Sequence, residues 1–210
     1  QETGYPLSGR ILLHVDPERP CPVCLKLRIP RWSRRTTVQL NGQPVEGAAP
    51  GRYLSLQRTW QPGDAVTLDL DLSLHAWPGE RESSGLTSVY RGPILLAYDH
   101  RYNLHLAADQ APSVRPGDAR ELQRAPRIWM PTLDARNMVG TPVPWAEMLP
   151  PWLLFEYKAE DGQTVRLCDF ASAGQAGTPY RSWLDLSNAP GPRAYSPGNP
   201  LRSHPLDENQ

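Results

Sequence analysis

The sequence predicts an all-β fold of two consecutive, antiparallel β-sandwich-like units, with a proline-rich connection between them and an extended or disordered tail after them. Two observations predict this class. Short runs alternate between apolar and polar residues with a period of two, and no run keeps the helical period for three turns or more. The 24 prolines and 16 glycines are spread along the 210 residues and separate these runs as turns would.

The first β-sandwich unit is predicted over residues 1–102. GRILLHVDPERP, which begins at Gly9, indicates a strand that a turn closes. VCLKLRIP, which begins at Val23, indicates a strand with one apolar and one polar face. In TTVQLNGQPVEG, the Asn41-Gly42 pair predicts a hairpin with a type I′ turn, because both central residues of that turn need φ > 0.

The rest of the first unit continues this pattern. GRYLSLQRTWQPGDAVTLDLDLSL (51–74) indicates a strand, a turn and a second strand, and HAWPGERESSG (75–85) indicates a loop. LTSVYRGPILLAYDHRYN (86–103) is mostly apolar and is interrupted by Gly92-Pro93. Proline cannot donate to a sheet ladder, so we expect Pro93 at a sheet edge, a bulge or the start of a strand.

A second, smaller β-domain is predicted over residues 103–187. Residues 103–150 are dense in proline and poorly patterned, and they form either a linker or loops of this domain. WLLFEYKAEDGQTVRLCDFAS (152–172) predicts a hairpin that turns at Asp161-Gly162. Residues 188–210 offer little to bury and are expected to form the tail.

Charge and cysteine content limit the classes of partner and the cellular compartment that we expect. Twenty-two basic and twenty-two acidic residues give a formal net charge of zero, so we expect no nucleic-acid partner. No run of about 18 apolar residues occurs, so we expect no membrane partner. Three cysteines, an odd number, argue against a disulfide framework and favour the cytoplasm over secretion. The chain lacks an initiator Met and enters a strand almost at once, so we expect Gln1 to be a cut in a longer protein.

The cysteines and histidines do not form a recognisable metal site. Cys21 and Cys24 have the spacing of half a zinc site, but no second pair follows, and side chains three apart on a strand point to opposite faces. His100 and His105 lie close to Asp99, which is compatible with a metal or acid–base cluster but more typical of hydrogen-bonded histidines in a loop. We therefore assign no metal ligand.

Catalytic motifs are also missing from the sequence. The nearest carboxylate pairs, Asp69 with Asp71 and Glu80 with Glu82, are two residues apart and indicate a solvated face, whereas glycoside chemistry needs two carboxylates across a cleft. No nucleophile elbow, phosphate-binding loop or dinucleotide fingerprint occurs. We assign no catalytic residue.

Aromatic residues are the remaining candidates for contact with substrate or with another domain. Trp77, in a predicted loop, and Trp145, among prolines, are expected to be exposed. DFASAGQAGTPYRSWLDL (169–186) combines small residues with Tyr180, Arg181 and Trp183, which are the residue types that dominate interface hot spots. An equally good interpretation makes these aromatic residues ordinary core anchors.

Five segments together give the chain a resemblance to a known family. In order they are QETGYPLSGRILLHVDPE, LKLRIPRWSRRTTVQLNGQPV, GRYLSLQRTWQPGDAVTLDLDL, VYRGPILLAYD and DFASAGQAGTPYRSWL. The series resembles the non-catalytic C-terminal β-domains of glycoside hydrolase family 127 (GH127), the β-L-arabinofuranosidase group. The resemblance covers most of residues 1–187.

The resemblance implies an accessory role. In that family a helical α/α barrel carries out catalysis with a cysteine nucleophile beside a zinc ion, and β-sandwich domains follow the barrel. The barrel would lie before Gln1, so the resemblance implies no cofactor in this chain, zinc in the missing catalytic domain, and that domain as the partner.

Three hypotheses follow. The first is an accessory region that supports the helical-barrel catalytic domain of a glycoside hydrolase. The second is an autonomous carbohydrate-binding module that uses exposed tryptophans. The third, a self-sufficient hydrolase, is disfavoured because the sequence contains no catalytic constellation.

Overall fold

The computed structural model describes residues 1–79, 83–109, 129–146 and 149–189. Within these ranges the chain is nearly all β and its sheets are antiparallel, which confirms the predicted fold class. One short pair, β11 (Leu133–Asp134) with β16 (Leu186–Ser187), is parallel. The predicted tail lies outside the described residues from residue 190 onward, as does the part of the proline-rich connection over residues 110–128.

The described residues divide into two compact units. Unit 1 contains residues 1–73 and 91–93, and unit 2 contains most of the chain that follows Ser73. The division falls earlier than the predicted boundary at residue 102. Segments assigned to the first domain from the sequence belong to unit 2, because their backbone hydrogen bonds join them to strands that come later in the chain.

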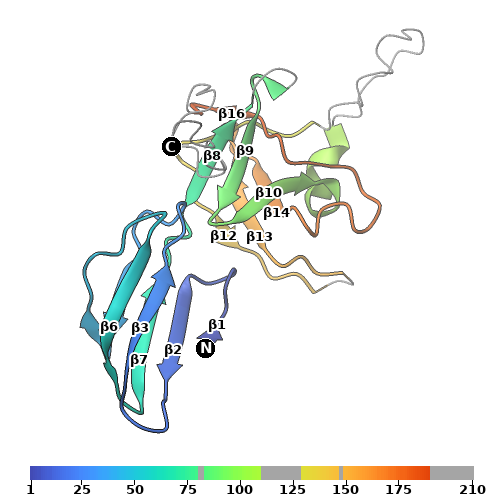
Figure 1. Cartoon of the computed structure of the whole chain (residues 1–210). Helices are drawn as coiled ribbons and strands as arrows, with labels where there is room; N and C mark the ends of the chain where they lie inside the picture. Colours follow the sequence, from blue (N-terminus) through green and yellow to red (C-terminus); the bar gives the residue numbers. More distant parts are fainter. Residues whose placement is uncertain (80–82, 110–128, 147–148, 190–210) are drawn as a thin grey trace, which may run out of the picture. The chain divides into compact units, whose positions relative to one another are not determined.

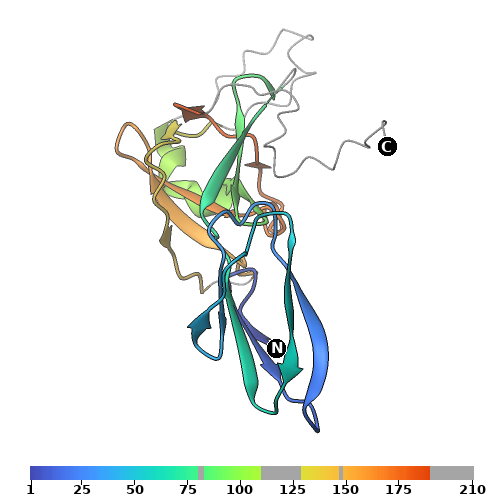
Figure 2. The same cartoon turned by 60° about the vertical axis from the view of Figure 1, so that its left-hand side comes forward.

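Unit 1 is a β-sandwich (Figures 1 and 2). A five-stranded sheet has the order β1 (Glu2–Thr3), β2 (Arg10–Val15), β7 (Asp64–Asp69), β4 (Thr37–Leu40) and β5 (Gln43–Pro44). A separate two-stranded sheet pairs β3 (Cys21–Arg28) with β6 (Tyr53–Trp60). The strand–turn–strand predicted over residues 51–74 is therefore confirmed, but its two strands belong to different sheets.

One apolar core joins the two sheets of unit 1. β6 contributes Leu54, Leu56 and Trp60, and the five-stranded sheet contributes Val38 and Val66, all of them buried. The alternation predicted from the sequence produces this core, because successive side chains of a strand point to opposite faces. Each buried aliphatic side chain adds roughly 1.5–3 kcal/mol to the stability of the unit.

The predicted hairpin at Asn41-Gly42 is confirmed, and its turn is joined to a second turn. Asn41 and Gly42 have φ of 50° and 77°, and β4 pairs with β5. The Asn41 Nδ2 donates to Asp64 Oδ1 over 2.7 Å, and Ala65 N donates to Asn41 Oδ1 over 2.8 Å. Asp64 Oδ2 accepts from Gln61 N over 2.9 Å. Asp64 therefore links the hairpin turn to the turn that precedes β7.

Unit 2 is built on a seven-stranded sheet (Figure 1). Along its main path the order is β12 (Thr141–Pro142), β13 (Leu154–Lys158), β14 (Thr164–Asp169), β10 (Ile94–Asp99), β9 (Thr87–Arg91) and β8 (Leu74–Pro78), and β15 (Tyr180–Arg181) also pairs with β10. β8 extends into residues 75–85, which the sequence predicted to be a loop. The segment has no clear alternation and contains Pro78, but β9 provides it with a pairing partner.

The β13–β14 hairpin confirms the predicted turn at Asp161-Gly162. It has an apolar face on each side of the sheet. Phe155 and Leu167 face the larger core of unit 2, whereas Leu154 and Cys168 belong to a smaller cluster on the opposite face. Both faces therefore need a covering layer, unlike the one-sided strands of unit 1.

A 3₁₀ helix, η2 (His100–Asp109), follows β10 and is the helical segment that the sequence did not predict. It is kinked at Asn103, where φ is −124°. The buried Asn103 amide donates to Arg166 O over 2.9 Å and accepts from Arg166 N over 2.8 Å, so it fixes η2 to β14. Within the described ranges, no helix has the length and apolar character needed to cross a membrane.

The link made by Asp64 predicts a pH-dependent stability. Hydrogen bonds from Gln61 N and Asn41, with the Arg58 charge nearby, lower the pKa of Asp64 from its ordinary value of 3.8. A carboxyl group whose pKa is lowered on folding stabilises the fold above its unfolded pKa, and this contribution is lost as the pH falls through the folded pKa.

We therefore expect Asp64→Asn to lower the free energy of unfolding at pH 7 and to have a smaller effect at pH 3, as measured by urea denaturation. Asp69→Asn, at an exposed carboxylate on the same strand, is the matched control and should have little effect at either pH. An equal loss at both pH values for Asp64→Asn would contradict a role for the charge.

Candidate functional site

The candidate site is a loop that runs from the end of β14 to β15, with the sequence DFASAGQAGTPYR (residues 169–181). We call it the aromatic loop, because Phe170 and Tyr180 stand at its two ends. Two buried carboxylates, Asp99 and Asp169, hold it in place. It contains Tyr180 and Arg181, two of the residues that the sequence indicated.

Asp99, the last residue of β10, anchors the middle of the aromatic loop. Its side chain is fully buried. Oδ2 accepts from Gly174 N over 2.8 Å, and Oδ1 accepts from the Thr178 hydroxyl over 2.6 Å and from Arg101 N over 2.8 Å. A buried carboxylate is costly unless hydrogen bonds satisfy it, so these three donors and the carboxylate hold one another in a single arrangement.

Asp169 anchors the start of the loop. It is 3% exposed; Oδ1 accepts from Ser172 N over 2.9 Å, and Oδ2 accepts from Leu153 N over 3.0 Å. The Ser172 hydroxyl in turn accepts from Trp152 N over 3.3 Å. The residues that lead into β13 are therefore tied to the same loop.

Three aromatic side chains on or next to this anchored loop are exposed to solvent. Phe170 is 42% exposed and Tyr180 is 43% exposed, and their rings meet edge to face with centroids 5.9 Å apart. Trp152, which donates to the loop through its backbone, is 67% exposed. We call Trp152, Phe170 and Tyr180 the aromatic patch.

The ring of Tyr180 lies directly on the backbone of Gly174. Gly174 has φ of +73°, and a Cβ at this position would lie 2.7 Å from two ring atoms of Tyr180. Glycine is therefore needed here both for its left-handed conformation and for the close approach of the ring. The small residues noted in the sequence serve the packing of the loop at this position.

Arg181 points away from the aromatic patch. Its Nε donates to Trp183 O over 2.7 Å, its Nη1 lies 2.9 Å from Asp185 Oδ2, and its side chain is 11% exposed. Arg181 pairs across strands with Tyr98. Burial raises the pKa of Tyr98 to about 12, against the opposing effect of the Arg181 charge, so its phenol stays neutral. Arg181 is thus part of the interior, and Trp183 is half-buried.

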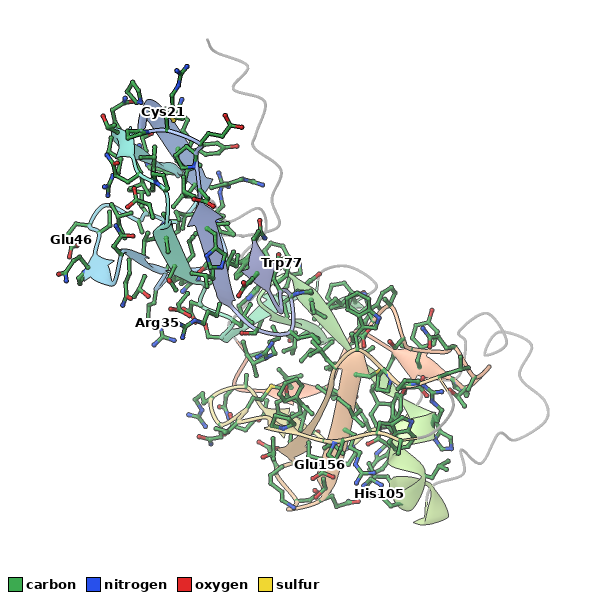
Figure 3. The ribbon with its side chains drawn as sticks, turned by 90° about the horizontal axis from the view of Figure 1, so that it is seen from below. Cys21, Arg35, Glu46, Trp77, His105 and Glu156 are labelled. Atoms are coloured by element: carbon green, nitrogen blue, oxygen red, sulfur yellow. The ribbon has the colours of Figure 1, made fainter. Side chains whose placement is uncertain are left out.

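The two tryptophans expected to be exposed are half-buried in the structure. Trp77 lies on β8 (Figure 3). Trp145 packs edge to face on the buried Tyr102, with centroids 4.8 Å apart, and it covers the small cluster on the outer face of β13–β14. The sequence indicated exposure because both residues have prolines or charged residues as neighbours, and it could not show what packs against them.

Sequence reasoning missed Phe170 and Trp152 as members of the site. Both lie in WLLFEYKAEDGQTVRLCDFAS, near the ends of the predicted hairpin. Phe170 follows the last residue of β14, and Trp152 stands two residues before the first residue of β13. This position just outside the paired strands was the available signal, because side chains there are released from the ladder and can reach the surface.

Other titratable side chains of unit 2 have structural roles. Burial, followed by the charges of Asp99 and Asp169, raises the pKa of the Cys168 thiol, so the thiol stays protonated and unreactive. His105 Nε2 lies 2.9 Å from Thr164 O (Figure 3). The Glu156 and Arg166 side chains form a cross-strand ion pair over 2.7 Å.

The structure does not bring metal ligands together in the part of the chain that it describes. Cys21 is opposite Trp60 and Cys24 is opposite Gln57 on β3, so the two thiols point to different faces. Across the described ranges, no group of three or more His, Cys, Asp or Glu side chains could hold a metal ion. The zinc that the family resemblance implies thus has no fitting ligand set on these residues, and its place in a separate catalytic domain stays a prediction.

Comparison with known proteins connects unit 1 to a family. Residues 1–72 match the family model described as the middle domain of GH127 β-L-arabinofuranosidase. Unit 1 is therefore similar to the GH127 middle domain. This match supports the GH127 resemblance drawn from the sequence. It covers the first three of the five segments that carry the resemblance. No curated protein is similar to the chain at a significant level.

Solved structures share the fold over most of the chain. A glycoside hydrolase matches with a TM-score of 0.63 and 20% identity, over 89% of this chain and 32% of its own. A GH127 β-L-arabinofuranosidase from Geobacillus stearothermophilus T6 matches with a TM-score of 0.61, 20% identity and coverages of 89% and 30%. A GH127 β-arabinofuranosidase matches with a TM-score of 0.58, 20% identity and coverages of 89% and 31%. The chain therefore spans about a third of each of these proteins.

The packing of Tyr180 on Gly174 gives a prediction with a built-in control. Gly174 and Gly177 both have φ of +73°, but nothing lies within 4 Å of a Cβ at Gly177. We expect Gly177→Ala to cost about 1–2 kcal/mol, the cost of a left-handed alanine. Gly174→Ala should cost about 1–3 kcal/mol more, because the new methyl group displaces the ring.

Urea denaturation of the two single variants measures this difference. In the double variant Gly174→Ala/Tyr180→Ala, the extra cost should disappear, because no ring remains to be displaced. Equal losses for the two glycine variants would contradict the close packing of Tyr180 on the loop.

Proposed function

We propose that this chain is a non-catalytic β region of a GH127-like glycoside hydrolase, and that it supports a helical-barrel catalytic domain that lies before Gln1 in the complete protein. The observation that carries the proposal is the match of residues 1–72 to a GH127 middle domain. A middle domain, as its description states, has protein on both sides of it.

The lengths of the matched structures support the same proposal. The fold of this chain occurs in them as 30–32% of a longer polypeptide, and two of the three are described as GH127 arabinofuranosidases. We propose that catalysis and its zinc ion belong to the remainder of such a polypeptide. The partner of this chain is then its own catalytic domain, and the carbohydrate is the substrate of that domain.

The alternative, an autonomous carbohydrate-binding module, relied on exposed Trp77 and Trp145. Both are half-buried, and Trp145 packs on Tyr102. Sugar-binding platforms need free aromatic faces. These two tryptophans therefore give the binding module no support, and the aromatic face that could serve it is that of Trp152.

The proposal predicts where activity resides. The complete protein, expressed from the gene with its sequence upstream of Gln1, should hydrolyse an aryl β-L-arabinofuranoside. The 210-residue chain should give no turnover above a heat-treated sample, with or without added zinc and thiol, because a nucleophile and a metal site are needed together. Turnover by the isolated chain that survives repurification would overturn the accessory role.

A further inference from the structure

The aromatic patch is an unusual surface for a loop so firmly anchored. Trp152, Phe170 and Tyr180 expose 67%, 42% and 43% of their surface. Aromatic rings that gather at a surface mark contact sites, since each ring leaves a large apolar area in water. Their exposure is not a result of a loose backbone, because Asp99 and Asp169 fix the loop that carries two of them.

Two polar side chains of the aromatic loop turn inward. The Thr178 hydroxyl donates to Asp99, and the Ser172 hydroxyl accepts from Trp152 N. Gln175 is exposed, and its amide donates to Ala171 O of the same loop over 3.2 Å. A sugar ligand needs directional hydrogen bonds to its hydroxyl groups beside the stacking ring. The loop uses both hydroxyl groups internally and exposes the Phe170 and Tyr180 rings, which suits a protein surface better than a carbohydrate.

The two charged side chains of the aromatic loop are directed inward. Asp169 is buried and accepts from Leu153 N and Ser172 N, and Arg181 Nη1 lies 2.9 Å from Asp185 Oδ2. Aromatic enrichment together with depletion of charge is the composition of the buried centre of a protein–protein interface. The anchored backbone lowers the entropy cost of binding, because the loop is already ordered.

We infer that the aromatic patch is the surface by which unit 2 docks against the helical catalytic domain of the same polypeptide. This inference rests on the proposed function. The matched structures contain about three times the length of this chain, so a complete protein of that kind has a large further domain available to cover the patch. Trp152, Phe170 and Tyr180 are the anchors of that contact.

Hydroxyl-radical footprinting with mass spectrometry tests the inference, since aromatic side chains are oxidised in proportion to their exposure. The complete protein and the 210-residue chain are labelled under the same conditions. Oxidation of Trp152, Phe170 and Tyr180 should fall by about threefold or more in the complete protein, as expected for side chains at the centre of an interface. Tyr53 of β6, which is 64% exposed and lies outside the patch, is the internal control for overall reactivity.

A pair of matched variants of the complete protein adds a second readout. Tyr180→Ser should raise the oxidation of Trp152 toward the level of the isolated chain, because it removes one anchor of the contact; Phe170 is left out of this comparison because its ring touches that of Tyr180. Tyr53→Ser should leave the oxidation of Trp152 unchanged. Both positions are exposed tyrosines, so neither substitution opens a core.

Three results would overturn the inference. Equal oxidation of the patch in the complete protein and in the isolated chain would exclude docking. Protection of the isolated chain on addition of arabino-oligosaccharide would establish a sugar platform. Protection that grows with the concentration of the isolated chain would establish contact with a second copy.

The proposed function fails by a different result. If the gene encodes no helical catalytic domain upstream of Gln1, the accessory role itself is wrong. If that domain is present and the patch stays fully reactive, only the docking surface is wrong.

Discussion

Unit 2 depends on the buried carboxylate of Asp99. This residue ends β10, the strand that pairs with β14 and β15, and its two oxygens accept from Arg101 N at the start of η2 and from Gly174 and Thr178 in the aromatic loop. A carboxylate without these donors would be an uncompensated buried charge, so the sheet, the 3₁₀ helix and the aromatic loop stabilise one another through it. Together with Asp169, this group fixes the loop that carries Phe170 and Tyr180.

The two units bury the apolar faces of their strands in different ways. In unit 1 one face of each sheet is apolar, and packing the two sheets against each other buries it. In unit 2 the β13–β14 hairpin is apolar on both faces, and the second face needs η2, Trp145 and the loops around them. Trp145, one of the aromatic residues predicted to be exposed, is half-buried because it helps to cover this second face. Of the aromatic residues indicated by the sequence, Tyr180 is exposed, and it begins β15.

The aromatic loop fits the proposed accessory role. The Ser172 and Thr178 hydroxyl groups fix its shape, so the loop exposes the rings of Phe170 and Tyr180 on an ordered backbone. Rigid apolar surfaces lose little entropy when another domain covers them. Two titratable side chains have structural contacts of this kind. Cys168 packs in the smaller apolar cluster, and His105 Nε2 lies close to Thr164 O.

The sequence by itself determined the fold class, the strands of unit 1 and the two hairpin turns, because alternation and Asn-Gly or Asp-Gly pairs act within a few residues. Only the tertiary structure decided which strands pair outside the hairpins, since sheet partners such as β10 and β14 are distant in sequence. That pairing moved the boundary between the units to Ser73, made a strand of the segment around Trp77 and buried much of Trp145. It also turned Arg181 inward and Tyr180 outward, because the direction of a side chain depends on what the sheet places beside it.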